Sequence, residues 1–323
     1  MKLSKKLLLG TGIGAAVAAA VPFIAGEIMW FGVLTKKGSD VTSKIFGQQP
    51  VPPEKPASYN ILEGIAEWYE NTPHTEILTV NPKNEIPCAE FFEVQGSHKW
   101  AIICHGYTSG PSGMAHYARE YYNKGYNVIL PYMRGNAKGI KAKNIVTYTM
   151  GYQDKYDLLG WIDYAVKADP ECEIVLHGES MGAATVMMTV GEKLPDNVKC
   201  AIEDCGYTSV WDEFSHQIVE MFHLPVFPFL DAAQICIKHH VDLDFKDASS
   251  INGLKKSKTP MLFIHGEADD FVPFEMVHRN YDAFDGEKDI LTIPGADHAV
   301  SVTTDPETYF NKVWEFVGKY VTE

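Results

Sequence analysis

Short apolar runs alternate along the chain with longer stretches in which apolar residues recur at helical spacing. Continuously apolar runs are typical of strands buried on both faces, and the periodic stretches are typical of the helices that cover such strands. Strands are predicted at residues 99–104, 126–130, 173–177, 199–203, 260–264 and 290–293. Helices are predicted at residues 113–123, 152–168, 180–194, 274–284 and 307–320. The alternation predicts a mostly parallel sheet with helices on both faces.

One segment, residues 207–254, interrupts this alternation. It contains no clear strand pattern, and residues 219–237 are crowded with large apolar side chains. A long insertion between two strands of a sheet adds packed helices, covers a site or forms an oligomer contact. We expect a domain over residues 57–323 that carries a helical lid at about residues 207–254, and the oligomeric state stays open.

The first 34 residues have the pattern of a membrane anchor or a secretory signal. Lys2, Lys5 and Lys6 precede an uncharged run of 19 residues, 7–25, and a helix needs about 20 residues to span a bilayer. An uncleaved anchor, a signal cleaved near residues 18–20 and a buried core helix remain open. The lysines favour export of the main domain. We expect a protein of the cell membrane with an extracytoplasmic domain, or a secreted protein if the segment is cleaved.

Residues 35–56 separate this segment from the predicted domain. They include four prolines, at positions 50, 52, 53 and 56. Because proline removes backbone donors and stiffens the chain, the segment is predicted to be an extended linker.

The composition is that of a globular protein with a large core, since 46% of the 323 residues are hydrophobic. The formal net charge of −14 opposes contact with phosphate backbones, so nucleic acid is not an expected partner. None of the six cysteines forms a C-x-x-C pair. Neither a zinc knuckle nor a thioredoxin motif is therefore indicated, and mostly free thiols are expected.

Ser180 lies within Gly-Glu-Ser-Met-Gly, residues 178–182, where a predicted strand gives way to a predicted helix. The G-x-S-x-G pattern in this context predicts a nucleophile on a sharp strand-to-helix turn. The alternative is a small residue that fills a tight turn. A serine hydroxyl becomes a good nucleophile only when a base takes its proton, so the two interpretations differ in whether the chain supplies partners.

His298 is the predicted base. It lies in PGADHAV, after the last predicted strand and before the last helix, where a loop can carry an imidazole over the edge of the sheet. Asp269, in FIHGEADDFVP, follows a predicted strand and is the predicted carboxylate partner of the imidazole. Asp204 and Asp270 remain rivals for that role.

Attack on a carbonyl creates an oxyanion, which preorganised N–H donors must stabilise. The backbone N–H of Met181 follows the nucleophile and is one expected donor. The second donor is expected from HGYTSG, residues 105–110, which follows an early strand, and the N–H of Tyr107 is the candidate. A site of this kind needs neither a metal nor an organic cofactor.

These motifs resemble those of bacterial α/β-hydrolases of the serine aminopeptidase and lysophospholipase-like (S33-type) group, close to membrane-anchored hydrolases. The resemblance covers about residues 75–320 and rests on HGYTSG, GESMGAATVMM, EDCGYTSVWDEF, TPMLFIHGEADDFVPF and GADHA. It implies the α/β-hydrolase fold, with Ser180, Asp269 and His298 as a triad in the chain order of that fold. It also implies an oxyanion N–H at Tyr107.

One loop departs from the resemblance. Relatives often read RGHG after the fourth strand, whereas this chain reads MRGNAKG at residues 133–139, so substrate preference is not carried over. The predicted function is hydrolysis of a small-molecule carboxylic ester or acyl substrate through an acyl-enzyme. A peptidase or amidase with the same triad and a catalytically decayed surface binding protein are the alternatives.

Overall fold

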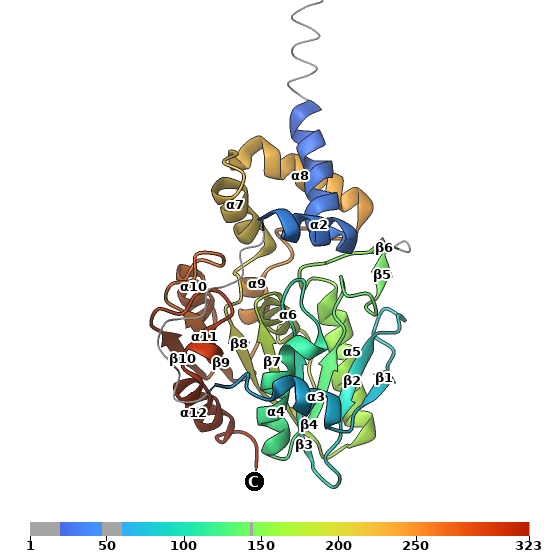
Figure 1. Ribbon diagram of the computed structural model, residues 1–323, viewed down its shortest axis with the longest axis vertical. Coiled ribbons are helices and arrows are strands. Elements are labelled where there is room, and N and C mark those ends of the chain that lie inside the picture. The colour runs from blue at the N-terminus through green and yellow to red at the C-terminus, as the bar shows by residue number, and fades with distance from the viewer. Residues whose placement is uncertain (1–19, 47–59, 143–144, 323) are drawn as a thin grey trace, which may run out of the picture.

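The computed structural model describes residues 20–46, 60–142 and 145–322, and its centre is an eight-stranded sheet (Figure 1). The strand order is β1-β2-β4-β3-β7-β8-β9-β10. The strands are β1 Thr75–Leu78, β2 Cys88–Phe92, β3 Lys99–Cys104, β4 Asn127–Pro131, β7 Glu173–Glu179, β8 Val198–Asp204, β9 Met261–Gly266 and β10 Lys288–Ile293. Strand β2 is antiparallel to both of its neighbours, and all other pairs are parallel. The predicted mostly parallel sheet is confirmed.

Helices cover both faces of this sheet, as predicted, and each face has its own buried core. The helices on one face are α3 Ile65–Asn71, α4 Ala115–Asn123 and α12 Pro306–Val317. Those on the other are α5 Asp154–Ala168, α6 Met181–Thr189 and α10 Glu275–Ala283. Along β3, Ile102 enters one core and Ile103 the other, and both are fully buried. Strands covered on both sides need apolar residues at every position, which explains the continuous apolar runs.

A cluster of helices lies at one end of the molecule, beyond the sheet (Figure 1). It consists of residues 20–46 together with α7 (Val210–Glu220) and α8 (Val226–His240), and we call it the cap. The insertion continues from α8 to α9 (Ser250–Leu254), which packs against α6. The cap therefore joins two segments that are far apart in the sequence.

The N-terminal part of the cap packs closely on α8. It contains a helix over residues 20–29, a π-helical turn η1 (Trp30–Leu34) and α2 (Lys36–Phe46). The Trp30 ring stacks on His240 of α8 with centroids 4.6 Å apart. A Cβ atom at Gly26 would lie only 3.0 Å from the Cα of Ala233. The glycine lets the two helices approach, and the segment is held by specific contacts.

These residues correct one prediction about the N-terminus. The extended linker predicted over residues 35–56 is wrong for residues 36–46, which form α2, because this stretch has no proline and keeps all of its backbone donors. Residues 47–56 lie outside the described residues. So do residues 7–19 of the predicted anchor. Within the described ranges, no helix is long and apolar enough to cross a membrane.

Candidate active site

Ser180 occupies the turn between β7 and α6, where it is the N-cap of the helix. Its backbone has φ 54° and ψ −115°, a positive φ that non-glycine residues rarely adopt. Backbone hydrogen bonds hold this conformation: the Ser180 N–H donates to the Asp204 carbonyl at 2.8 Å, and the Ser180 carbonyl accepts from the Ala184 N–H at 3.0 Å. This is the strained strand-to-helix turn that the G-x-S-x-G pattern predicts.

The two glycines of that pattern are required by close approach of the backbone. A Cβ atom at Gly178 would lie 2.3 Å from the carbonyl oxygen of Gly182, and one at Gly182 would lie 2.1 Å from the carbonyl oxygen of Cys104. Both distances are far inside the optimal separation of about 3.5–4.0 Å. The strand, the turn and α6 can therefore pack this closely only where side chains are missing.

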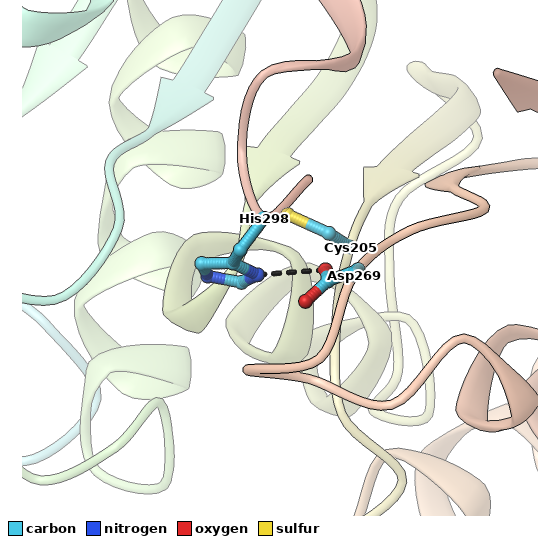
Figure 2. Close-up of side chains that lie close together, drawn as sticks. All are labelled: Cys205, Asp269 and His298. Carbon is cyan, nitrogen blue, oxygen red and sulfur yellow. Dashed lines mark hydrogen bonds and ion pairs between the residues drawn. The ribbon is translucent and has the colours of Figure 1, made fainter. Parts of the chain in front are cut away.

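The structure brings the three side chains of the predicted triad together. The distance from His298 Nε2 to Ser180 Oγ is 2.9 Å, and that from His298 Nδ1 to Asp269 Oδ2 is 2.8 Å. Figure 2 shows the imidazole turned toward the Asp269 carboxylate. The three residues follow β7, β9 and β10, so three strand ends converge. A line from hydroxyl to imidazole to carboxylate can carry a proton away from the serine.

Asp269 is ionised although it is buried. Burial raises its pKa, but hydrogen bonds from His265 and His298 outweigh burial and lower the pKa to about 2. The other carboxylate oxygen, Oδ1, accepts the backbone N–H groups of Phe271 at 3.0 Å and Val272 at 2.9 Å. The carboxylate is therefore both charged and fixed in orientation, as a partner of an imidazole must be.

The pKa of His298 is raised above its ordinary value. Burial lowers this pKa, but the hydrogen bond and charge of Asp269 outweigh burial, and the carboxyl groups of Glu213 and Glu179 act in the same direction as Asp269. The ring of Phe271 covers the imidazole, with centroids 4.9 Å apart. A raised pKa makes the imidazole a stronger base toward the serine hydroxyl.

Neither of the two rival carboxylates is hydrogen-bonded to the imidazole of His298, whose Nδ1 is bonded to Asp269. Asp270 is exposed, and its backbone carbonyl accepts a hydrogen bond from His216 Nε2 at 2.9 Å. Asp204 is fully buried, and its Oδ2 lies 3.3 Å from the hydroxyl of Tyr117. The geometry thus selects Asp269 from the three candidates.

Of the two residues predicted to supply oxyanion donors, Met181 directly follows Ser180, and Tyr107 belongs to a turn that approaches Ser180 through Gly106. Met181 is the first residue of α6, so its N–H has no acceptor within the helix. Tyr107 is the second residue of a turn that is closed by a 3.3 Å hydrogen bond from the Ser109 N–H to the Gly106 carbonyl. A Cβ atom at Gly106 would lie 3.4 Å from the Ser180 Cβ. The turn that carries Tyr107 is therefore in contact with the nucleophile.

Comparison with known families adds to this geometry. Residues 114–323, well over half of the chain, match the prolyl oligopeptidase family, Peptidase_S9. The chain belongs to the prolyl oligopeptidase family. It is a serine hydrolase, and the matched region contains Ser180, Asp269 and His298. The comparisons do not show the serine aminopeptidase grouping that the motifs resemble.

One relative matches the chain in sequence, and solved structures match it in fold. The chain is 25% identical over 322 residues to the uncharacterized protein YqkD of Bacillus subtilis, covering 97% of each chain. It superposes on the Pyrococcus furiosus esterase Pf2001 with TM-score 0.62 and 20% identity, over 84% of this chain and 99% of that one. It superposes on the Pyrococcus horikoshii acylaminoacyl peptidase with TM-score 0.56 and 15% identity, over 81% of this chain and 45% of that one. The predicted α/β-hydrolase fold is confirmed.

This member of the prolyl oligopeptidase family has a pair of neighbouring carboxyl groups, the buried Asp204 and the half-buried Glu179, that the sequence pattern did not reveal. Glu179 and Asp204 end β7 and β8 and are partners in register. The hydroxyl of Tyr117 lies 3.2 Å from Glu179 Oε2 and 3.3 Å from Asp204 Oδ2. Burial raises the pKa of Glu179 to about 7 and that of Asp204 to about 6. Two acids at equivalent ends of neighbouring strands are the signal that would have located this pair.

Cys205 also lies beside the triad without a predicted role. Its Sγ and ligand atoms of Asp269 and His298 lie within 4.8 Å of one another, a set that could hold a metal ion (Figure 2). However, Asp269 and His298 already share a hydrogen bond, and burial raises the pKa of the Cys205 thiol, which disfavours the thiolate that a metal needs. The geometry fits a proton relay better. All six cysteines are buried free thiols, as predicted.

Proposed function

We propose that the protein hydrolyses carboxylic esters, with Ser180 as nucleophile, His298 as base and Asp269 as the group that orients the imidazole. The N–H groups of Tyr107 and Met181 stabilise the tetrahedral oxyanion, and water releases the acid from an acyl-enzyme. The observation that carries this proposal is the unbroken hydrogen-bonded line from Ser180 Oγ through His298 to Asp269, with distances of 2.9 Å and 2.8 Å.

Each group has one task in the reaction. His298 takes the hydroxyl proton as Ser180 attacks, and returns it to the leaving alcohol when the tetrahedral intermediate collapses. Asp269 stays ionised, because its pKa is about 2, and it stabilises the imidazolium that forms between these steps. The same relay then activates water against the acyl-enzyme.

Similarity to a solved esterase supports an ester substrate. This chain spans 99% of the P. furiosus esterase but 45% of the P. horikoshii peptidase. The acylaminoacyl peptidase therefore carries a large further part that the present chain does not match. The apolar insertion at residues 207–254 supports an acyl or aromatic group on the substrate. Amide cleavage by the same triad is the second candidate, because the chemistry of the two reactions is shared.

We also propose that the protein is attached to the cell membrane. The uncharged run of residues 7–25, behind Lys2, Lys5 and Lys6, serves as a membrane anchor with the hydrolase domain outside the cytoplasm. Protease protection of spheroplasts tests this part, since an exported domain is digested from outside and a cytoplasmic one is protected.

Replacement of Ser180 tests the catalytic assignment. Ser180→Ala is expected to lower kcat on p-nitrophenyl acetate by about 10⁴-fold or more, and to abolish labelling by a fluorophosphonate probe. Ser109→Ala, in the neighbouring turn, is the control that keeps the label. Parental activity of Ser180→Ala would end the assignment. Rates on short acyl esters and on aminoacyl p-nitroanilides then decide between ester and amide cleavage.

A further inference from the structure

Exposed apolar side chains are concentrated on the cap. Of seventeen large hydrophobic residues that are exposed in the described part of the chain, nine lie in the cap, and two more, Met221 and Phe222, lie in the loop between α7 and α8. Six belong to its N-terminal part: Val21, Phe23, Ile24, Ile28, Phe31 and Val41. On α8, Phe227 is 77% exposed and Ile235 is 60% exposed. Apolar exposure that is concentrated in one region of a protein, rather than scattered singly, marks an interaction surface.

The N-terminal helix presents these residues as a stripe. Val21, Ile24 and Ile28 recur at spacings of three and four, which places them on one helical face, and Phe31 continues that face into η1. Their exposed fractions lie between 45% and 65%. The opposite side of the helix is fixed on α8 by Trp30. The stripe therefore points away from the protein in a defined orientation.

A groove beside the stripe extends the same surface. It runs between the N-terminal helix and α2, and its lining includes Ile24, Ile28, Phe31 and Val41. The one charged group in the lining, Glu27, accepts a hydrogen bond from His240 Nε2 at 2.9 Å. The charge is thus partnered, and the rest of the groove is apolar or small.

We propose that this apolar face of the cap rests on the lipid bilayer, in its interfacial layer. The inference rests on the anchor included in the proposed function. The uncharged run of the anchor reaches residue 25 and overlaps the stripe, which begins at Val21. No spacer separates the two, so an anchored chain holds the stripe at the membrane surface. Because the net charge is −14, apolar insertion rather than attraction to anionic lipid provides the contact.

Fluorescence quenching on the full chain tests this contact. Ile28→Cys and a control, Glu171→Cys, are each labelled with an environment-sensitive fluorophore; Glu171 precedes β7, at the end of the strand remote from Ser180. Labelling is selective because all six native thiols are buried. In phosphatidylcholine vesicles, the label at residue 28 is expected to be quenched by a lipid-linked quencher and protected from iodide. The label at residue 171 is expected to be quenched by iodide and not by the lipid-linked quencher.

Every other outcome overturns the proposal. Equal iodide quenching of both labels on vesicle-bound protein means that the chain is anchored but the cap stands off the bilayer. Protection of the label at residue 28 in dilute detergent, with elution as a dimer, assigns the face to a second copy. A chain that does not bind vesicles has neither anchor nor docking face. Fluorophosphonate labelling of Ser180 in the same samples reports the hydrolase separately, and it also verifies that each variant is folded.

Discussion

The hydroxyl of Tyr107 donates a 2.5 Å hydrogen bond to the backbone carbonyl of Val33, 74 positions earlier in the chain. One residue carries a proposed oxyanion donor, and the other belongs to the cap. The Tyr107 ring also packs against Tyr148, with centroids 4.4 Å apart, and the Tyr148 N–H donates to the Leu34 carbonyl at 2.8 Å. The N-terminal part of the cap therefore holds the turn that lies against the nucleophile.

Loss of this contact is expected to slow catalysis. Tyr107→Phe keeps the backbone N–H but removes the bond to Val33, which contributes about 1 kcal/mol and corresponds to about a fivefold lower kcat. KM should change little, because the side chain positions the oxyanion donor and not the substrate. The matched control is Tyr320→Phe, whose hydroxyl bonds the exposed Glu287 at 2.8 Å. Equal kcat for both variants would show that the hydrogen bond from Tyr107 to the cap does not affect catalysis.

Removal of the charge on Asp269 is expected to cost far more. Asp269→Asn keeps the size of the side chain but leaves His298 without the acceptor that fixes its tautomer, so kcat should fall by about 10⁴-fold. Asp270→Asn is the adjacent control, because Asp270 is exposed and only its backbone is bonded. Steady-state kinetics on one ester compares them. If Asp270→Asn lowers kcat more than Asp269→Asn does, Asp269 is not the carboxylate that orients the imidazole.

The pH dependence of activity follows from His298. Only the neutral imidazole can accept the serine proton, so kcat/KM should rise with pH through the pKa of His298. Because Asp269 outweighs burial and raises this pKa, the rising limb should lie above the ordinary value of about 6.5. A profile from pH 5 to 9 on an ester that does not itself titrate measures it. A rise of kcat/KM that is centred below pH 6 would contradict the raised pKa of His298.

Stability should depend on pH through Glu203. Its Oε2 accepts the Gly206 N–H at 2.9 Å, and its Oε1 has no hydrogen-bond partner among the described residues. Burial raises the pKa of Glu203 to about 8, above the unfolded value of about 4.3. A raised carboxyl pKa gives stability that is complete below the unfolded value and is lost as pH rises through 8.

Glu203→Gln, which mimics the protonated carboxyl, should therefore leave the Tm unchanged at pH 4 and raise it by at least about 2 °C at pH 9. Thermal unfolding of both proteins across this range measures the difference. Glu171→Gln, at an exposed position, should give parallel curves. A Glu203→Gln protein whose Tm tracks the parent at every pH would show that this carboxyl ionises freely in the folded state.

Most of the central sheet was predictable because burial on both faces forces continuous apolar runs, which are visible in the sequence. Strand β1, at the edge of the sheet, was not, since it is largely exposed and short, and its neighbour β2 was missed with it. Helix α2 was missed because the prolines from position 50 onward dominated the interpretation of residues 35–56. The pair Glu179 and Asp204 was missed because its members are 25 positions apart and meet only through the register of β7 and β8.

The sequence by itself determined the alternation of strands and helices and the turn at Ser180, because both depend on residues that are neighbours in the chain. It also limited the partners of Ser180 to a few loops after strands. Only the tertiary structure decided that Asp269, rather than Asp204, meets His298, and that residues 20–46 pack on α8 and reach Tyr107. Such choices depend on strand order and on the packing of distant segments, which no local pattern of residues encodes.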